Sequence, residues 1–337
     1  MPLDRRQFCS QSLAGLTAVS AATTLGYHRD AMAQSRRSRR GDQESEGTPR
    51  VSFDLPQTHR WRMGLSLKTG STCQNVIATF PIPVNWPEQE VRLVAKNIDN
   101  PMTRWITRPA PGGTTQVVAS VAKVAASSET EIMFEFDVKK HRIVAPEVTD
   151  DLVIPTRPSR DIKLYLGTSP EIDHTHRTIR AAYAELSAEP YDNAWQLVER
   201  MYDYVRDNVR YVNGPIQRAS LALENGYGDC EEMTSLVVAL CRNAKIPARM
   251  VWVPEHCYPE FYLEDADGDG HWFPCQAAGT RQFGGIEEYR PVLQKGDRFR
   301  VPEKRGKPQR YLTEFFTCEV KGRSDPNPTF VLEQVDV

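Results

Sequence analysis

The chain has 337 residues, of which 40% are hydrophobic and 26% are charged. This supplies enough apolar material for one large or two ordinary globular domains, and we expect two. Lys and Arg number 42 against 44 Asp and Glu, which gives a formal net charge of -2. The charge balance therefore favours neither nucleic acid nor an anionic membrane as a partner.

The N-terminus has the features of an export signal. Arg5 and Arg6 precede an uncharged, moderately apolar stretch over 7–27, and Ala31-Met32-Ala33 follows. This order resembles a bacterial twin-arginine signal. The stretch is rich in Ser, Thr and Ala, a composition that suits a cleavable signal better than a membrane span. We expect cleavage to remove residues 1–33 and leave a periplasmic or extracellular protein without a membrane span.

Residues 34–50 follow, with the sequence QSRRSRRGDQESEGTPR. This segment has no large apolar residue, so it cannot bury enough surface to offset the entropy lost on ordering. We expect a disordered linker. Export would also place the remaining cysteines in an oxidising compartment, where disulfides persist. These are Cys73, Cys230, Cys241, Cys257, Cys275 and Cys318.

Residues 51–158 show a hydrophobic period of two. Apolar and polar residues alternate in two clear runs, Trp61, Met63, Leu65, Leu67 and Ile132, Phe134, Phe136, Val138. Such alternation is typical of half-buried strands, and prolines and glycines separate the runs. The pattern predicts an antiparallel β-sandwich domain without a catalytic constellation.

After residue 158 the period changes to three and four. A helix is expected over about 192–210, with its apolar stripe facing a core. A weaker helix is expected over 172–186, and a third begins near Cys230. Three strand candidates follow, at 248–253, 256–263 and 271–276. Residues 159–337 therefore form an α+β domain with a C-terminal extension, and α+β is the predicted fold class.

Cys230 lies where the third helix begins. Gly226 and Gly228 permit an unusual backbone just before Asp229, which can cap the helix. The amides and the dipole at a helix N-terminus favour a thiolate, the form that attacks a carbonyl. Two glutamates directly after Cys230 oppose this effect, so the thiolate requires a basic partner.

His256 is the first histidine after Cys230, and it begins a predicted strand. Histidine can take the thiol proton and later return it to a leaving amine. A third residue should then accept the other ring N–H and fix the tautomer. His271 is the rival base, although a histidine just after a turn is ordinarily exposed.

The stretch YGDCEEMTSLVVALCRNAKIPARMVWV, followed by HCYPEFYLEDADGDGHWFPCQ, resembles the transglutaminase-like superfamily of papain-like cysteine acyltransferases and peptidases. The resemblance covers about 164–278. It implies a core of helices packed on an antiparallel sheet, with Cys230 as nucleophile and His256 as base. The family's aspartate follows a tryptophan on the next strand, and this chain has Gln276 there. An amide oxygen can orient the imidazole but cannot offset its positive charge, so activity is either reduced or lost.

The run DADGDG at 265–270 has two interpretations. Asp265, Asp267 and Asp269 match the first half of a calcium loop, but the last ligand position holds Gln276 rather than Glu. Asp and Gly between two strands also make an ordinary hairpin turn, which we prefer.

A turn centred on Ala266 would set the register of this hairpin. It pairs His256 with Gln276 and Cys257 with Cys275. Because side chains alternate faces, His256 and Gln276 would share the face toward Cys230 while both cysteines point to the other face. Cys257 and Cys275 could then form a disulfide if they occupy a narrow pair.

These features predict an exported cysteine enzyme that forms a thioester at Cys230 on a peptide or protein amide. Water as acceptor makes it a peptidase or amidase, and an amine makes it a transglutaminase. This chemistry needs no metal and no organic cofactor. The alternative is a non-catalytic, peptide-binding envelope module whose triad has degenerated at Gln276.

Overall fold

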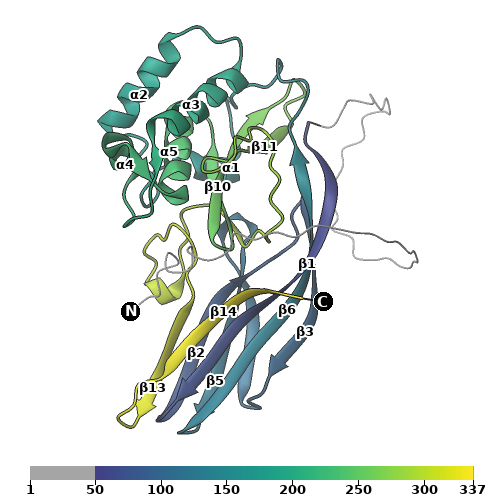
Figure 1. Ribbon diagram of the computed structural model, residues 1–337, viewed down its shortest axis with the longest axis vertical. Coiled ribbons are helices and arrows are strands. Elements are labelled where there is room, and N and C mark those ends of the chain that lie inside the picture. The colour runs from purple at the N-terminus through teal and green to yellow at the C-terminus, as the bar shows by residue number, and fades with distance from the viewer. Residues whose placement is uncertain (1–49, 337) are drawn as a thin grey trace, which may run out of the picture. The chain divides into compact units, whose positions relative to one another are not determined.

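The structure is a computed structural model that describes residues 50–336, and Arg50–Val337 form one compact unit. The expected signal at 1–33 and the expected linker, apart from Arg50, lie outside the described residues. The fold is α+β, as predicted, with three four-stranded sheets. Figure 1 shows the helices gathered beside β10 and β11, while the long strands β1, β2, β5 and β6 run together.

The sandwich consists of two antiparallel sheets, with strand orders β14-β1-β6-β3 and β13-β2-β5-β4. The strands are β1 (Ser52–Thr69), β2 (Thr72–Ile82), β3 (Gln89–Ile98), β4 (Thr103–Pro109), β5 (Thr115–Val124), β6 (Ser128–Val144), β13 (Phe315–Lys321) and β14 (Asn327–Val335).

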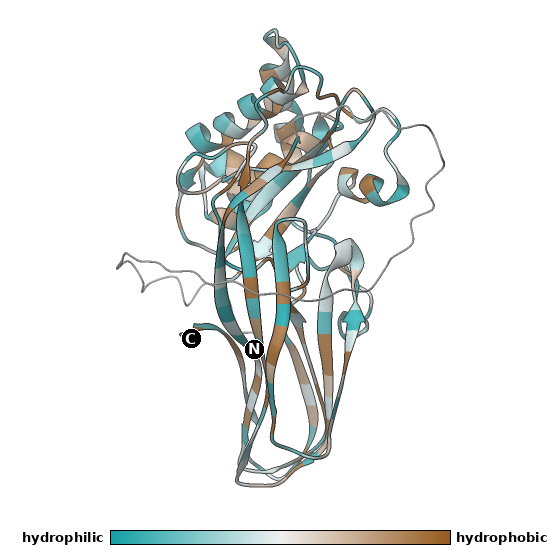
Figure 2. Cartoon of the chain, turned by 90° about the vertical axis from the view of Figure 1, so that its right-hand side faces the viewer, coloured by the Kyte–Doolittle hydropathy of each residue, from teal (hydrophilic) through white to brown (hydrophobic). Residues whose placement is uncertain are grey.

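The predicted period of two is confirmed in the sandwich core. Every apolar residue of the two runs named above is at most 6% exposed, from Trp61 in β1 to Val138 in β6. These residues pack in one cluster between the two sheets. Figure 2 shows hydrophobic and hydrophilic segments following one another along the long strands.

The C-terminal strands differ from the expected arrangement. Residues after the catalytic hairpin were expected to extend the second domain, but β14 pairs with β1, and β13 pairs with β2. Without them, β1 and β2 would each present an open edge of unpaired backbone groups. Phe330 and Leu332 of β14 also pack against the sandwich core. The sandwich is thus built from both ends of the described chain.

The second part contains α1 (Arg160–Lys163), α2 (Arg177–Ala188), α3 (Ala194–Asn208), α4 (Ala219–Asn225) and α5 (Cys230–Asn243). Its antiparallel sheet has the order β11-β10-β9-β12, with β9 (Ala248–Val253), β10 (His256–Glu264), β11 (Gly270–Pro274) and β12 (Gln294–Lys295). A short parallel pair joins β7 (Arg210–Tyr211) to β8 (Tyr227–Gly228). The three long helices and three strands expected here are confirmed, with ends shifted by a few residues, whereas α1 and α4 were not predicted.

Helix α5 is buried on all sides rather than along a single stripe. Every residue from Glu231 to Arg242 is buried. The helix packs against α2, α3 and α4 and also against β9 and β10. A helix enclosed in this way holds its first residue, Cys230, in a fixed place relative to the sheet.

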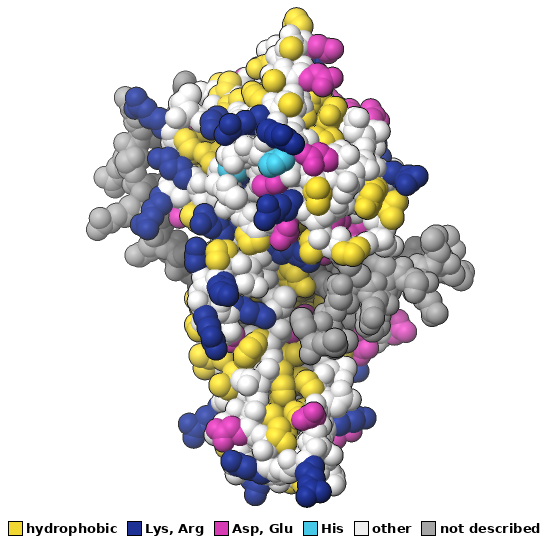
Figure 3. Space-filling model, turned by 90° about the vertical axis from the view of Figure 1, so that its left-hand side faces the viewer, with side chains coloured by type: hydrophobic (Ala, Val, Ile, Leu, Met, Phe, Trp, Pro, Cys, Tyr) yellow, Lys and Arg dark blue, Asp and Glu magenta, His cyan; other side chains and the backbone are white. Residues whose placement is uncertain are grey.

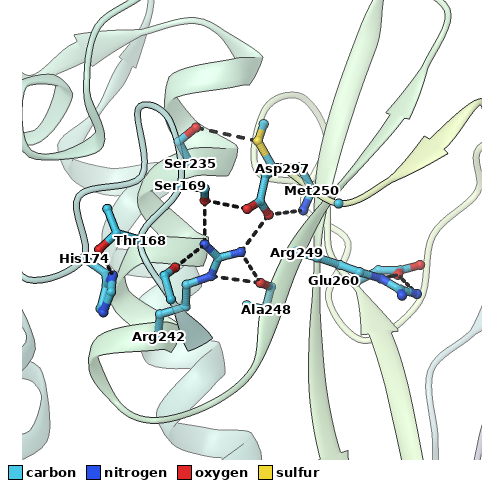
Figure 4. A network of polar contacts seen from close by, with 12 residues as sticks. Thr168, Ser169, His174, Ser235, Arg242, Ala248, Arg249, Met250, Glu260 and Asp297 are labelled. Carbon is cyan, nitrogen blue, oxygen red and sulfur yellow. Dashed lines mark hydrogen bonds and ion pairs between the residues drawn. The ribbon is translucent and has the colours of Figure 1, made fainter. Parts of the chain in front are cut away.

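Arg242 near the end of α5 ties this helix to the sheet (Figure 4). Its guanidinium donates to Asp297 Oδ2 at 2.7 Å, to Ser169 Oγ at 2.7 Å and to Ala248 O at 2.7 Å. The Arg242 side chain is 0% exposed and that of Asp297 is 2% exposed. A buried ion pair needs such additional hydrogen bonds to offset the cost of desolvation.

Lys295 of β12 links the sheet of the second part to the sandwich. Its ammonium lies 2.8 Å from a carboxylate oxygen of Glu88, just before β3, and 2.8 Å from Glu260 in β10. The Gln89 side-chain amide adds a hydrogen bond to Val292 O at 3.1 Å. These buried contacts explain why the two parts form one compact unit.

Acidic and basic side chains are mixed over the face shown in Figure 3, in keeping with the small net charge. Within residues 50–336, no helix is long and apolar enough to cross a membrane.

Candidate active site

Cys230 is the first residue of α5, as predicted, and a capping box fixes it there. Asp229 Oδ1 accepts the backbone N–H of Glu231 at 2.8 Å, and Glu232 Oε2 accepts the N–H of Asp229 at 2.8 Å. Gly228 is required because an added Cβ would lie 2.5 Å from Glu232 Cβ. Gly226 has a φ of 68°, a conformation that glycine adopts without strain.

The two glutamates beside Cys230 oppose a thiolate less than the sequence suggests. Arg310 lies 2.7 Å from Glu231 Oε2 and offsets that charge. Burial raises the pKa of Glu232 to about 7, so a large share of this carboxyl is neutral near pH 7. Arg310 was not predicted because it lies far along the chain and belongs to no motif.

Cys230 and His256 each shift the pKa of the other. The pKa of Cys230 lies well below its ordinary value, because the Cys257 thiol donates a hydrogen bond and His256 adds a hydrogen bond and a positive charge, which together outweigh burial. Burial lowers the pKa of His256, but its hydrogen bond with Cys230 and the negative charge of the thiolate raise it by more. The pKa of His256 therefore lies above its ordinary value. Each group thus favours the charged form of the other, as in a thiolate–imidazolium pair.

Gln276 lies next to His256, with 2.8 Å between His256 Nε2 and Gln276 Oε1. Its backbone is held from α3, where Tyr202 Oη donates to Gln276 O at 2.9 Å and Arg206 Nη1 donates to the same oxygen at 3.1 Å. Tyr202 belongs to the apolar stripe of α3, which the sequence predicted to pack in the core. Its hydroxyl also fixes the third residue of the site.

The predicted hairpin register is wrong by two positions. Strand β10 pairs Glu260 with Pro274 and Glu264 with Gly270, so the turn is centred on Asp267 rather than Ala266. This shift of the turn centre by one residue moves His256 out of direct opposition to Gln276. Because side chains alternate with a period of two, a shift of two leaves Gln276 on the face from which its side chain reaches His256.

The predicted pairing of Cys257 with Cys275 is also wrong. All six cysteines within 50–336 are free. Cys257 lies opposite Trp252 of β9, and the N–H of Cys275 donates to Pro259 O at 3.0 Å. The shifted register therefore separates the two cysteines along the strands.

The sequence suggested that Cys257 points away from Cys230, and this prediction is wrong. Cys257 Sγ donates to Cys230 O at 3.5 Å, and Cys257 belongs to the same core cluster as α5. The strand face that carries Cys257 is therefore the one that α5 covers. His256, at the first position of β10, reaches the first turn of α5 from the strand's end.

His271, the alternative candidate for the base, makes its contacts near the hairpin turn rather than beside Cys230. Its Nε2 lies 2.8 Å from Asp265 Oδ2, and it pairs with Leu263 near the turn, at the opposite end of β10 from His256. Asp265 Oδ1 also accepts the N–H groups of Asp267 and Asp269, at 3.1 and 3.0 Å. These are the contacts of the ordinary hairpin turn that was preferred over a calcium loop.

Residues 180–277 match the model of a family described as the transglutaminase-like superfamily. No curated protein matches the chain. A crystal structure described as a candidate cysteine protease from Cytophaga hutchinsonii is 15% identical, with a TM-score of 0.52, and the match covers 85% of this chain and 93% of that one. A candidate protease from Parabacteroides distasonis is 14% identical, covers 72% of this chain and 49% of that one, and has a TM-score of 0.26.

The last likeness is too weak to support an argument, and at 15% identity the first shows a similar fold alone. The family match includes the start of α5 and the hairpin that follows, so it contains Cys230, His256 and Gln276. This chain therefore carries a transglutaminase-like domain at residues 180–277.

Proposed function

We propose that this protein is an exported cysteine enzyme that acts on amide bonds of peptides or proteins through a thioester at Cys230. The observation that carries the proposal is the placement of Gln276 Oε1 2.8 Å from His256 Nε2, together with the effect of Cys230 and His256 on each other's pKa. A nucleophile, a base and a group that orients the base are the parts that thiol-dependent acyl transfer needs.

In the proposed reaction, the Cys230 thiolate attacks the amide carbonyl carbon. The positive end of the α5 helix dipole lies at Cys230 and favours the negative charge that develops on the carbonyl oxygen. The His256 imidazolium gives its proton to the leaving amine, and a thioester remains. His256 then takes a proton from the attacking acceptor.

The acceptor decides the class of enzyme. Water gives a peptidase or amidase, and an amine gives a transglutaminase. Neither route requires a metal or an organic cofactor, because protein groups carry every proton and charge. Residues 1–33 would direct export by a twin-arginine route, and N-terminal sequencing from the native host should then find a start at or near Gln34.

A second candidate function is peptide binding without catalysis. The observation that favours it is Gln276, which supplies no full negative charge to stabilise the imidazolium. In that case the surface beside Cys230 would hold a peptide in the cell envelope without cleaving it.

Labelling with a peptide-like, thiol-directed electrophile tests the first proposal. We expect covalent addition at Cys230, complete loss of labelling in Cys230→Ala, and no loss in Cys318→Ala, a partly buried cysteine of the sandwich. A screen of peptide amides should then find an activity that Cys230→Ala lacks. No labelling of Cys230 in the folded protein, and equal activity of both variants, would end the enzyme proposal.

A further inference from the structure

A second thiol lies against the proposed nucleophile and forms no bond to the substrate in the proposed amide chemistry. Cys257 Sγ donates to Cys230 O at 3.5 Å, across the contact between α5 and β10. Cys257 is 0% exposed, whereas Cys230 is partly exposed. A reagent from solvent therefore reaches Cys230 first, and Cys257 lies behind it.

The two thiols also differ in chemistry. Hydrogen bonds from Cys257 and with His256 lower the pKa of Cys230, which favours the reactive thiolate form of this sulfur. Burial and the neighbouring Cys230 charge raise the pKa of Cys257 well above its ordinary value, so this sulfur keeps its proton. The Cys230 sulfur is thus suited to attack an oxidant, and the Cys257 thiol is suited to attack the oxidised Cys230 sulfur afterwards.

The other cysteines within 50–336 lack this combination. Cys73, Cys241 and Cys275 are buried, and burial raises the pKa of Cys241 to about 12. Cys318 is partly exposed, but burial beside Cys73 raises its pKa to about 11. Cys230 alone among the described cysteines combines partial exposure with a lowered pKa.

We propose that Cys230 and Cys257 form a peroxide-reactive pair, in which a hydroperoxide oxidises Cys230 and Cys257 closes a disulfide with it. The inference uses the same thiolate as the proposed function but does not depend on amide chemistry. The disulfide would remove the nucleophile reversibly and protect it from irreversible oxidation.

The steps balance as follows. The Cys230 sulfur attacks one peroxide oxygen, the O–O bond breaks, and the other oxygen leaves as water or an alcohol after taking a proton. Sulfur loses two electrons and becomes a sulfenic acid. The Cys257 sulfur then attacks the Cys230 sulfur, and the displaced hydroxide leaves as water with the Cys257 proton. A dithiol reductant restores both thiols.

The test begins with fully reduced protein treated with one equivalent of hydrogen peroxide. Free thiols are then alkylated, and non-reduced peptides are identified by mass spectrometry. We expect a linked peptide that joins Cys230 to Cys257, two hydrogen atoms lighter than the two free peptides together. Dithiothreitol should then restore alkylation of Cys230 in full.

Two variants sharpen this test. Cys257→Ala should give no linked peptide, should accumulate sulfinic acid at Cys230, and should recover several-fold less alkylation after reduction. Cys318→Ser should behave as the parent protein. Sulfinic acid at Cys230 of the parent without a linked peptide, or equal recovery in Cys257→Ala, would overturn the inference. Since no substrate is used, failure of the amide chemistry leaves these outcomes unchanged.

Discussion

At the scale of single residues, the site depends on what surrounds one sulfur. Cys230 is placed by the capping box of Asp229 and Glu232, and its pKa is lowered by Cys257 and His256. Gln276 holds the other side of the imidazole, where a carboxylate would stand in the family that the sequence resembles. The unusual feature of this site is therefore a neutral group next to the base.

We expect Gln276→Asp to retain or raise the activity and Gln276→Leu to lower it. Aspartate keeps an acceptor for His256 Nε2 and adds a charge, whereas leucine leaves the imidazole unoriented. Loss of a hydrogen bond to a charged group costs about 1.5–3 kcal/mol, which corresponds to a rate loss of about 10- to 150-fold. Initial rates on a cleaved peptide amide measure the effect.

A matched control is Gln57→Leu. Gln57 Oε1 also contacts a histidine, with 3.2 Å to His59 Nε2, but it lies on the exposed surface of the sandwich. This variant should have the parent's rate. If neither substitution at Gln276 changes the rate, Gln276 has no part in the mechanism.

The sequence predicted Cys230, His256 and Gln276 because residue type and chain order carry that information. It could not place Cys257 or Arg310. Cys257 alternates in β10 with His256, but alternation does not show which face α5 covers. Arg310 reaches Glu231 from a loop without secondary structure, so no periodic pattern indicates the contact.

At the scale of elements, the position of α5 on β9 decides where Cys230 lies. Arg242 binds Asp297 and the backbone oxygens of Gly167 and Ala248 from within the core. The end of the helix is therefore fixed to the sheet by a charged group with no access to water, and α5 cannot slide without breaking these bonds.

Arg242→Met should destabilise the protein by about 3–5 kcal/mol, since it leaves the buried Asp297 carboxylate without its partner. Combining it with Asp297→Leu should cost less than the sum of the two single changes. Urea unfolding measures the free energies. The control Arg281→Met removes a surface pair with Asp203 and should cost about 0–1 kcal/mol. Equal costs at both arginines, or strict additivity with Asp297→Leu, would contradict this account.

The strands of the catalytic hairpin were predicted from their residues, but their register was not. The turn is centred one residue later than expected, because Asp265 accepts two backbone N–H groups and closes over Asp267 and Asp269. Such local hydrogen bonds depend on side-chain geometry, which the spacing of hydrophobic residues does not report.

At the scale of the whole molecule, the sandwich and the α+β part are connected in two ways. The chain returns to the sandwich through β13 and β14, and Lys295 forms buried ion pairs with Glu88 and Glu260. The hydrophobic period of two predicted the sandwich. This pattern does not show which strands pair with one another, so the sequence did not predict that β13 and β14 join the sandwich. We expect residues 50–336 to unfold in one cooperative transition.

Lys295→Met should lower the stability by about 3–5 kcal/mol, because it leaves the buried Glu88 carboxylate without its ion-pair partner and leaves Glu260 with Arg249 alone. Lys139→Met is the control, since the Lys139–Glu90 pair is exposed on both sides and should contribute about 0–1 kcal/mol. Calorimetry of both variants measures the difference. Two separate transitions in the parent protein, or an unchanged midpoint in Lys295→Met, would show that this contact does not couple the two parts.

The central claim is that the Cys257 thiol and His256 together favour the Cys230 thiolate, and the pH dependence of Cys230 alkylation tests it most directly. A lowered pKa means that the thiolate persists as pH falls below the ordinary thiol range, so the rate should stay high at pH 7 and fall only at lower pH. His256→Ala should move the inflection upward, toward the ordinary cysteine pKa of about 8.5. An inflection in that ordinary range in the parent protein, unmoved by His256→Ala, would contradict the account.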